Sequence, residues 1–155
     1  MKVTALEEYG LRCMLLFVEK GNGAPLTIPE ISASEKLSIP YAGKLLMILK
    51  QAGLVRAVRG RNGGYMLSKP PEEIQLREIF GALGDPFFGN HHCSRYTGDS
   101  DVCVHNVDCK VRNMWSSFDR FINGILEKVS LADLASGSFK FLETQDIQSE
   151  KRESA

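Results

Sequence analysis

Apolar residues recur at helical spacing in the first part of the chain. Between Thr4 and Lys20 they occupy positions 6, 9, 13, 14 and 17, and two glycines follow within the next three residues. Intervals of three and four residues are typical of an amphipathic helix, and glycine commonly ends one. The pattern therefore predicts a first helix whose apolar face packs on a core.

Two shorter helices are predicted directly after it. Thr27 precedes a helical stretch with Glu30 three residues on, an arrangement that resembles a capping box. After a break, another helix begins near Ser38 or Pro40 and ends at Gly53, with apolar residues at core spacing. Two short helices joined by a tight turn are typical of a helix-turn-helix.

A two-stranded hairpin is predicted after these helices. The stretch LVRAVRG alternates apolar and basic residues, residues 61–64 read Arg-Asn-Gly-Gly, and YMLS alternates again. Because the tip combines arginines with glycines, its backbone can approach a phosphate or enter the minor groove of DNA. A basic hairpin in this place indicates the wing of a winged helix, and the alternative is a solvated hairpin that is merely basic.

The longest periodic run of the chain extends from Lys110 to Val129. Its apolar residues fall on one stripe, formed by Val111, Met114, Trp115, Phe118, Phe121, Ile122, Ile125 and Val129. A small winged helix has too little surface to cover such a face easily, so we expect it to pack against its copy in a homodimer. Packing inside the monomer is the alternative.

These patterns predict a mainly α fold, a winged helix-turn-helix with a two-stranded wing and a long C-terminal dimerisation helix. The expected parts are a DNA-binding domain over 1–83, a cysteine-bearing, cluster-binding loop over 84–109 and a dimerisation helix region over 110–136. Residues 137–155 form a polar tail that we expect to be disordered.

Charge is segregated along the 155-residue chain, although the formal net charge is zero. Residues 1–70 contain ten Lys or Arg against five Asp or Glu, whereas residues 71–155 contain nine against fourteen. Between positions 36 and 69 there are seven basic residues and no acidic one. This stretch has the electrostatic character of a surface that binds nucleic acid.

The candidate DNA-binding residues lie in the helix-turn-helix and the wing. They are Thr27, Ser38, Tyr41, Lys44, Lys50, Arg56, Arg59, Arg61, Asn62 and Gly63. We expect the N-terminal part of the second short helix to enter the major groove, and mainly Lys and Arg contacts to phosphate on a palindromic double-stranded operator. The alternative is a merely exposed helix face.

Other function classes find little support in the chain. The start of the chain lacks the long apolar core of a signal peptide, and no run approaches the roughly 20 apolar residues that a membrane span needs. We therefore expect a cytoplasmic protein with reduced thiols and no membrane partner. No Walker or dinucleotide-binding glycine pattern is present, so we expect neither an enzyme nor a small-molecule substrate.

Three cysteines, Cys93, Cys103 and Cys109, lie in a polar loop before the long helix. Their spacing differs from the close pairs of structural zinc sites, whereas iron-sulfur clusters accept thiolates from longer loops. The positive end of the long helix should favour the Cys109 thiolate. The spacing favours a cluster and leaves redox-active thiols and zinc open, while Cys13 is expected to be a buried small hydrophobe.

The order of these parts resembles the Rrf-type family of winged-helix regulators, typified by the iron-sulfur regulator IscR and the nitric-oxide-sensing repressor NsrR. The resemblance rests on the opening MKVTALEEYGLRCM, the wing LVRAVRGRNGGYMLS, the three-cysteine loop and the helix with Trp115, and covers roughly residues 1–136. It implies a homodimer with crossed long helices, often a repressor. It also implies an iron-sulfur cluster on the three cysteines, for which we prefer [2Fe-2S] over [4Fe-4S], and DNA binding that depends on the cluster.

Two departures from the family pattern leave the fourth cluster ligand open. The gap between the first two cysteines is longer than in the best-known members, and the histidine that serves in IscR is Arg112 here. In NsrR-like members an acidic residue of the partner's first helix takes this role, and Glu8 occupies the matching position. Glu8 is therefore favoured, with His91, His92 and His105 as alternatives. A regulator without a cluster, switched by oxidation of its cysteines, is the alternative function.

Overall fold

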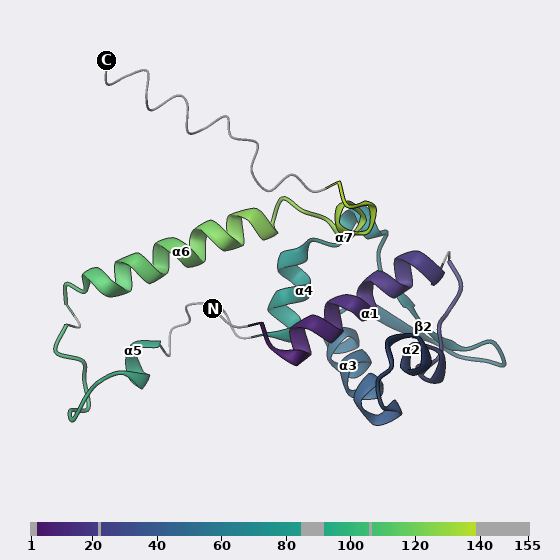
Figure 1. Ribbon diagram of the computed structural model, residues 1–155, viewed down its shortest axis with the longest axis horizontal. Coiled ribbons are helices and arrows are strands. Elements are labelled where there is room, and N and C mark those ends of the chain that lie inside the picture. The colour runs from purple at the N-terminus through teal and green to yellow at the C-terminus, as the bar shows by residue number, and fades with distance from the viewer. Residues whose placement is uncertain (1–2, 22, 85–91, 106, 139–155) are drawn as a thin grey trace, which may run out of the picture.

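The computed structural model describes residues 3–21, 23–84, 92–105 and 107–138. The elements are α1 (Ala5–Gly21), α2 (Ile28–Glu35), α3 (Ile39–Gln51), β1 (Val55–Val58), β2 (Gly64–Leu67), the 3-10 turn η1 (Pro71–Glu73), α4 (Leu76–Leu83), α5 (His92–Arg95), α6 (Lys110–Leu126) and α7 (Leu131–Ser136). Helices α1 to α4, the hairpin and α7 form one body, and α6 projects from it with α5 near its far end (Figure 1). The predicted fold class, a mainly α winged helix-turn-helix with a long C-terminal helix, is confirmed.

Side-chain caps set the boundaries of the helix-turn-helix. Thr27 and Glu30 form the predicted capping box of α2, since each side chain bonds to the backbone of the other residue. Ser38 caps α3 by accepting a hydrogen bond from the backbone N–H of Tyr41 at 3.3 Å. Between the helices, Lys36 adopts the left-handed conformation with φ of 56°, which ends α2 and turns the chain into α3.

The wing is an antiparallel pair in which Val55 faces Leu67 and Val58 faces Gly64. A third short segment joins it, because Leu26 and Tyr65 exchange two backbone hydrogen bonds of 2.8 Å each. Gly64 lies so close to this segment that an added Cβ would be 2.6 Å from the carbonyl oxygen of Leu26. The residue that pairs with the wing therefore directly precedes the cap of α2, and this fixes the wing beside the helix-turn-helix.

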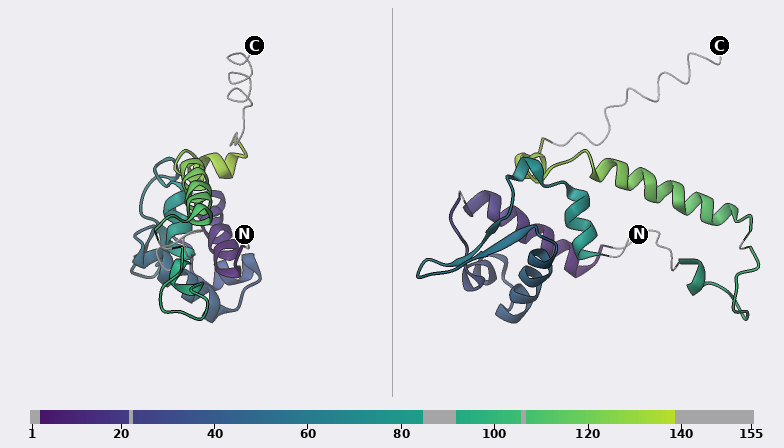
Figure 2. Two further views of the ribbon diagram at one scale, coloured as in Figure 1. Left: turned by 90° about the vertical axis from the view of Figure 1, so that its left-hand side faces the viewer. Right: turned by 180° about the vertical axis from the view of Figure 1, so that it is seen from behind.

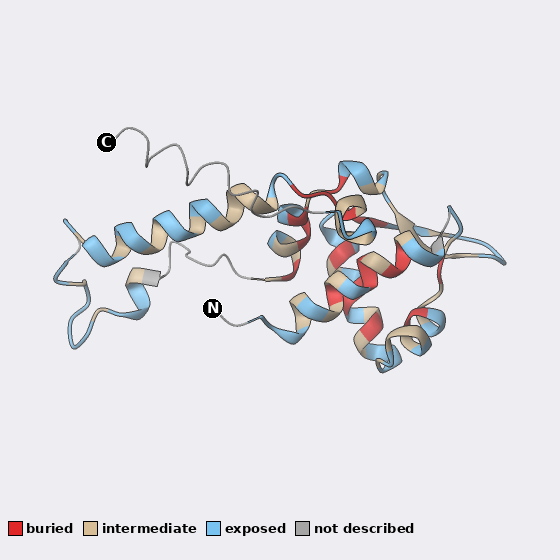
Figure 3. Ribbon diagram, turned by 45° about the horizontal axis from the view of Figure 1, so that its top comes forward, coloured by how far each residue is buried: buried red, intermediate tan, exposed pale blue. Residues whose placement is uncertain are grey.

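The hydrophobic core lies entirely within the body. Figure 3 shows buried residues concentrated in α1, α3, α4 and the segments next to them, with none along α6. Cys13 is fully buried in this core, as predicted. Burial raises the pKa of its thiol to about 12, and the nearby carboxylate of Glu35 adds to the effect. Cys13 is therefore held as a neutral, unreactive thiol.

Helix α6 leaves its apolar stripe largely open to solvent. Val111, Met114, Phe118 and Phe121 are 59%, 44%, 48% and 60% exposed, and none of its residues is buried. The helix meets the body at its C-terminal end, where Leu126 packs against the core and the following Glu127 forms an ion pair with Arg77 of α4. The monomer therefore does not cover the face that the sequence marks as apolar.

The sequence-based description of the C-terminal part needs two corrections. Val129 was placed on the long helix, but the helix ends at Leu126 and Val129 is buried in the body, where its carbonyl accepts from the backbone N–H of Leu76. Leu131 of α7 is also fully buried in the core, so α7 belongs to the body rather than to the dimerisation helix. The reason is that residues 129–131 pair through their backbone with residues 74–76, where the chain enters α4. Residues 139–155, the predicted disordered tail, lie outside the described part.

None of the helices in the described part of the chain is both long enough and apolar enough to span a membrane.

Removing the cap of α2 should destabilise the body. Thr27→Ala deletes the hydroxyl that donates to the Glu30 carboxylate at 2.7 Å and accepts from the Glu30 backbone N–H. Loss of a threonine cap costs about 1 kcal/mol, so the midpoint of urea denaturation should fall. Thr27→Ser retains the hydroxyl and should remain close to wild type. Equal midpoints for the alanine variant and the wild type would contradict the assignment of the cap.

The same cap should make stability depend on pH. Hydrogen bonds from the Thr27 side chain, and next from its backbone, lower the pKa of Glu30. A carboxylate whose pKa is lower in the folded state stabilises above its unfolded pKa, and this contribution is lost as the pH falls through the folded pKa. The difference between the urea denaturation midpoints of the wild type and Thr27→Ala should therefore become smaller at acidic pH. A difference that stays constant from neutral to acidic pH would contradict this linkage.

Candidate DNA-binding surface and cysteine site

Basic side chains extend from α3 to the wing. Lys44 and Lys50 are exposed on α3, and Arg56, Arg59 and Arg61 are exposed on the hairpin, together with Asn62. Gly60 has φ of 116°, a conformation suited to glycine, and its carbonyl accepts from the backbone N–H of Gly63 to close the tip. Five positive side chains thus lie on adjoining elements without an acidic residue among them, as a phosphate-binding surface requires.

Some of the predicted DNA-binding residues have structural roles. The hydroxyls of Thr27 and Ser38 cap their helices. The ring of Tyr41 is half-buried and packs edge-on against Tyr9, with ring centroids 6.0 Å apart. Lys69, which counted toward the basic stretch, forms an ion pair with Glu78 at 2.7 Å. These side chains are therefore less available to DNA than their sequence positions suggest.

Helix α1 contacts both helices of the helix-turn-helix through residues of its N-terminal half. Arg12 forms an ion pair with Glu35 of α2 at 2.7 Å, and its guanidinium carbon lies 5.3 Å from the centre of the Tyr9 ring. Tyr9 in turn contacts Tyr41 of α3. A displacement of the start of α1 would therefore be transmitted to both helices.

All three loop cysteines line one cavity of about 280 Å³ between α5 and α6. Its lining residues are Cys93, Ser94, Thr97, Asp101, Val102, Cys103, His105, Cys109 and Arg112. Cys93 lies on the single turn α5, an element that the sequence did not indicate, and Cys109 caps α6. The three thiols are free and half-buried, so residues up to sixteen positions apart in the sequence face a common space.

The cavity fits an electron-rich metal cluster by the chemistry of its walls. The Cys109 sulfur accepts a hydrogen bond of 3.3 Å from the backbone N–H of Arg112, at the positive end of α6. The Arg112 side chain also lines the cavity, and positive charge stabilises thiolates. Among the described residues, no three His, Cys, Asp or Glu side chains converge closely enough to hold a metal ion. Three cysteine thiols around one cavity are a donor set of the kind that iron-sulfur clusters use.

The candidates for a fourth ligand differ in whether they line the cavity that the three cysteines share. His105 lines the cavity, and so does Asp101, which the sequence reading missed because nothing in its local pattern distinguishes it from other loop acids. Glu8 is exposed near the start of α1 and does not line the cavity of its own chain. In the right-hand view of Figure 2 the loop lies at the far end of α6, away from the body. His91 and the side chain of His92 lie outside the described residues.

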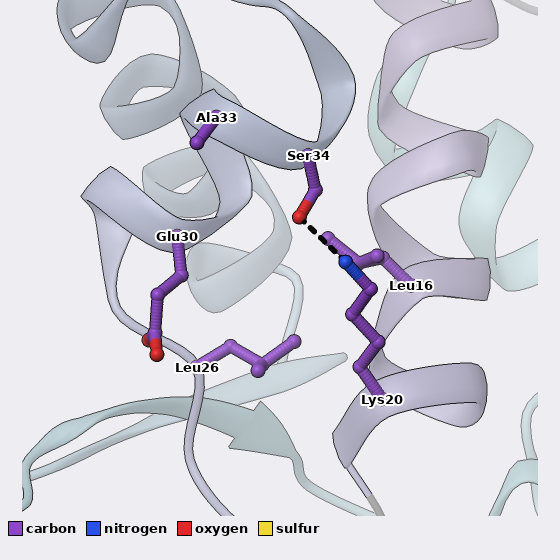
Figure 4. A pocket seen from close by; sticks show the side chains of 6 residues that line it. All are labelled: Leu16, Lys20, Leu26, Glu30, Ala33 and Ser34. Carbon is purple, nitrogen blue, oxygen red and sulfur yellow. Dashed lines mark hydrogen bonds between the residues drawn. The ribbon is translucent and has the colours of Figure 1, made fainter.

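A second, shallow cavity of about 260 Å³ lies between the end of α1 and α2. Figure 4 shows Lys20 extending from α1 toward Ser34, to which its ammonium group donates a hydrogen bond of 2.9 Å, with Glu30 on the opposite wall. Leu16 and Leu26 provide its apolar side. The arrangement links α1 to α2, and none of the predicted functional residues lines this cavity.

Known proteins share the sequence and the architecture of this chain. Residues 3–137 match the family described as Rrf2, iron-dependent transcriptional regulator. The chain is 30% identical over 134 residues to a Haemophilus influenzae protein assigned as an HTH-type transcriptional regulator, with 86% of each chain covered. It is 27% identical over 136 residues to the HTH-type transcriptional regulator IscR of Cereibacter sphaeroides, again with 86% of each covered. Its structure is similar to that of CymR, the global cysteine regulator of B. subtilis, with a TM-score of 0.66, 26% identity and coverage of 88% of this chain and 97% of that chain.

The family match extends through both features described above, the winged helix and the cysteine-bearing segment that precedes and includes α6. The proteins it resembles are regulators of transcription rather than enzymes. Sequence, fold and comparison agree, and this chain belongs to the Rrf2 family of transcriptional regulators.

Proposed function

We propose that the protein is a homodimeric, DNA-binding transcription regulator whose operator binding is controlled by an iron-sulfur cluster on Cys93, Cys103 and Cys109. The observation that carries the proposal is the convergence of these three thiols on one cavity beside α6. The other end of α6 is joined to a winged helix with a basic surface. A sensor site and a DNA-binding surface are thus connected through one helix.

In the proposed complex, α3 enters the major groove and the wing contacts phosphates or the minor groove. The exposed charges of Lys44, Lys50, Arg56, Arg59 and Arg61 support this orientation. Such contacts position the protein on the duplex, and sequence is read by the face of α3 that reaches the bases.

The wing contacts predict a specific dependence on salt. Arg59→Ala should weaken binding to every duplex by a similar factor. It should also make the fall of the logarithm of the binding constant with the logarithm of the salt concentration less steep, by about one unit of slope per subunit. Fluorescence anisotropy at several salt concentrations measures this slope. Glu19→Ala, a change of an exposed charge on α1, is the control and should leave the slope unchanged. A wild-type affinity that hardly changes with salt would refute the assignment of the basic surface.

The homodimer follows from the open stripe of α6. Four large apolar side chains on this helix are exposed, and Trp115 and Phe118 form a contact with ring centroids 6.0 Å apart at its centre. An apolar face of this kind is stable in water when it is covered, and a second α6 provides a matching face. A two-fold dimer would present two copies of α3, which calls for a palindromic operator.

The three thiols would hold the cluster, with [2Fe-2S] favoured over [4Fe-4S], and Arg112 and the N-terminus of α6 would balance its negative charge. When bound, the cluster supplies a redox-active centre that responds to redox state, nitric oxide or the supply of iron and sulfide. With the cluster bound, the three cysteines would hold the loop that joins them in one arrangement. Loss of the cluster would allow this loop to rearrange.

Glu8 of the partner subunit is the proposed fourth ligand. The side chain is exposed at the start of α1 and does not line the cavity of its own chain, which favours the cavity of a partner subunit as its place. Since Tyr9 and Arg12 connect this part of α1 to α2 and α3, a ligand at position 8 would couple the cluster to the DNA-binding helices. His105, which lines the cavity, is the ligand from within the chain that competes with it.

The identity of this ligand has a direct spectroscopic test. Glu8→Ala should alter the visible and electron paramagnetic spectra of the anaerobically purified protein, while His105→Ala leaves them unchanged. Glu7→Ala is not a suitable control, because the Glu7 carboxylate accepts hydrogen bonds from Thr4 at the start of α1. Glu19→Ala, which removes an exposed carboxylate from the same helix, is the suitable control. The reverse result, a change with His105→Ala alone, would assign the ligand to His105.

A cluster-free regulator switched by cysteine oxidation is the second candidate. It is favoured by three free, half-buried thiols around one cavity and by the similarity to a global cysteine regulator. Iron and sulfide analysis of protein purified without oxygen separates the two functions. Stoichiometric iron and sulfide support the cluster, and colourless, iron-free protein that forms a disulfide on oxidation supports the thiol switch.

A further inference from the structure

We propose that the outer face of α3 reads thymine methyl groups in the major groove through Ile39 and Met47, which flank a close-approach point at Gly43. The inference rests on the proposed entry of α3 into the major groove and adds which bases it selects. In the described part of the winged-helix body, the exposed large apolar residues are Val3, Ile39 and Met47, and two of the three lie on this helix.

Ile39 and Met47 are 55% and 52% exposed, on a helix whose opposite face is fully buried. Positions 39, 43 and 47 are separated by four residues each, so they form one stripe along the helix. Both ends of this stripe are apolar side chains that are more than half exposed. They are therefore available to a ligand with apolar groups about two helical turns apart.

Gly43 has no explanation inside the protein. A Cβ added there would meet only the tip of Ile28, at 3.9 Å, which is an ordinary contact. Glycine in the interior of a helix is destabilising relative to alanine, so the stability of the helix alone would favour alanine at this position. Glycine is useful where another molecule must approach the backbone closely.

Charge identifies the other molecule as a polyanion. Lys44 and Lys50 are exposed on the same helix, and α3 contains no acidic residue. Two copies of this basic surface would repel each other, whereas the negatively charged phosphates of DNA would attract it. Within the major groove the thymine methyl is the apolar group that base pairs offer, and apolar side chains contact it.

The hydrogen-bonding side chains near the start of α3 are engaged elsewhere. The Ser38 hydroxyl accepts from the Tyr41 backbone, and the Tyr41 ring lies against Tyr9. Besides Lys44, the exposed side chains that remain for base recognition on this face of α3 are the apolar Ile39 and Met47. The half-site should therefore contain thymines opposite Ile39 and Met47.

The first test removes only the methyl groups. A duplex is enriched from a random-sequence pool with the full-length dimer, in cluster-loaded and in iron-free form, and each thymine is replaced by deoxyuridine in turn. Burial of one methyl is worth about 0.8 kcal/mol, so replacing the critical thymine should weaken binding about fourfold in one half-site and roughly fifteenfold in both. Met47→Ala and Ile39→Ala should each abolish the dependence on one thymine position, whereas Met47→Leu should keep it.

The second test separates a structural from a recognition role at Gly43. Gly43→Ala should raise the melting temperature, because alanine is the better helix former and has room. The same variant should lose at least about tenfold in affinity for the enriched duplex, because the new methyl holds the helix away from the groove. A variant that is more stable and binds as well as wild type overturns the close-approach role.

The outcomes distinguish this inference from the function on which it rests. Two results would refute thymine recognition while leaving DNA binding intact. One is a change in affinity of less than twofold for deoxyuridine at every position, and the other is an unchanged dependence on thymine methyl groups in both Ile39→Ala and Met47→Ala. If no duplex is enriched in either form, DNA binding itself is overturned and the inference with it.

Discussion

Cys103→Ala is expected to abolish the visible absorption of the anaerobically purified protein, together with its bound iron and sulfide. Cys103 lies between the other two cysteines in the chain and lines the same cavity. Removing one of three thiolates leaves a cluster with too few protein ligands to be retained. Metal analysis and absorption spectra measure the loss, and the affinity for the operator should become the same with and without added iron and sulfide.

The matched control is Cys13→Ala, the same chemical change at the cysteine outside the cavity. Cys13 is fully buried in the core, and burial raises the pKa of its thiol to about 12. This variant should lose some stability, since a buried sulfur is removed, yet keep its colour and its iron. Full retention of colour and iron by Cys103→Ala would exclude Cys103 as a ligand. Loss of colour in both variants, with normal folding, would contradict the assignment of the cavity.

Replacing Phe118 and Phe121 together by aspartate is expected to convert the dimer into monomers. Both rings are exposed on the stripe of α6, at 48% and 60%. Burying two carboxylates against an apolar face is strongly unfavourable, so the dimer should dissociate. Because a monomer engages one half-site instead of two, affinity for the full operator should fall by about 100-fold or more.

Light scattering and anisotropy measure the two effects in the same preparation. Asn113→Asp adds a negative charge to an exposed position off the stripe and should leave the dimer intact. Circular dichroism should show an unchanged body, since neither Phe118 nor Phe121 belongs to the core or is among the side chains packed against it. A double variant that remains dimeric would place the subunit interface on another surface.

Local signals in the sequence were sufficient for the winged helix. Thr27 and Glu30 predicted the start of α2, Ser38 predicted the start of α3, and the Arg-Asn-Gly-Gly stretch predicted the hairpin. Each of these features depends on hydrogen bonds or backbone conformations within about four residues. Such interactions are encoded by neighbouring residues, so a pattern can reveal them without knowledge of the fold.

Contacts between distant parts of the chain required the tertiary structure. Leu26 pairs with Tyr65 across 39 positions of sequence, and Tyr41 packs on Tyr9 rather than facing outward. Val129 continued the helical period of α6, yet it is buried in the body because the chain pairs there with Leu76. Periodicity shows which residues are apolar and does not show which surface covers them.

The difference between what local sequence signals predict and what depends on tertiary packing is clearest at the cysteine site. The sequence by itself determined the donor atoms, the basic half of the chain, and an apolar helix that one small domain has too little surface to cover. Only the tertiary structure decided that the three thiols share a cavity with Asp101, His105 and Arg112, and that Glu8 of the same chain does not line it. The reason is physical: residue identity sets chemistry and local conformation, whereas the position of a side chain in space depends on how separate elements pack.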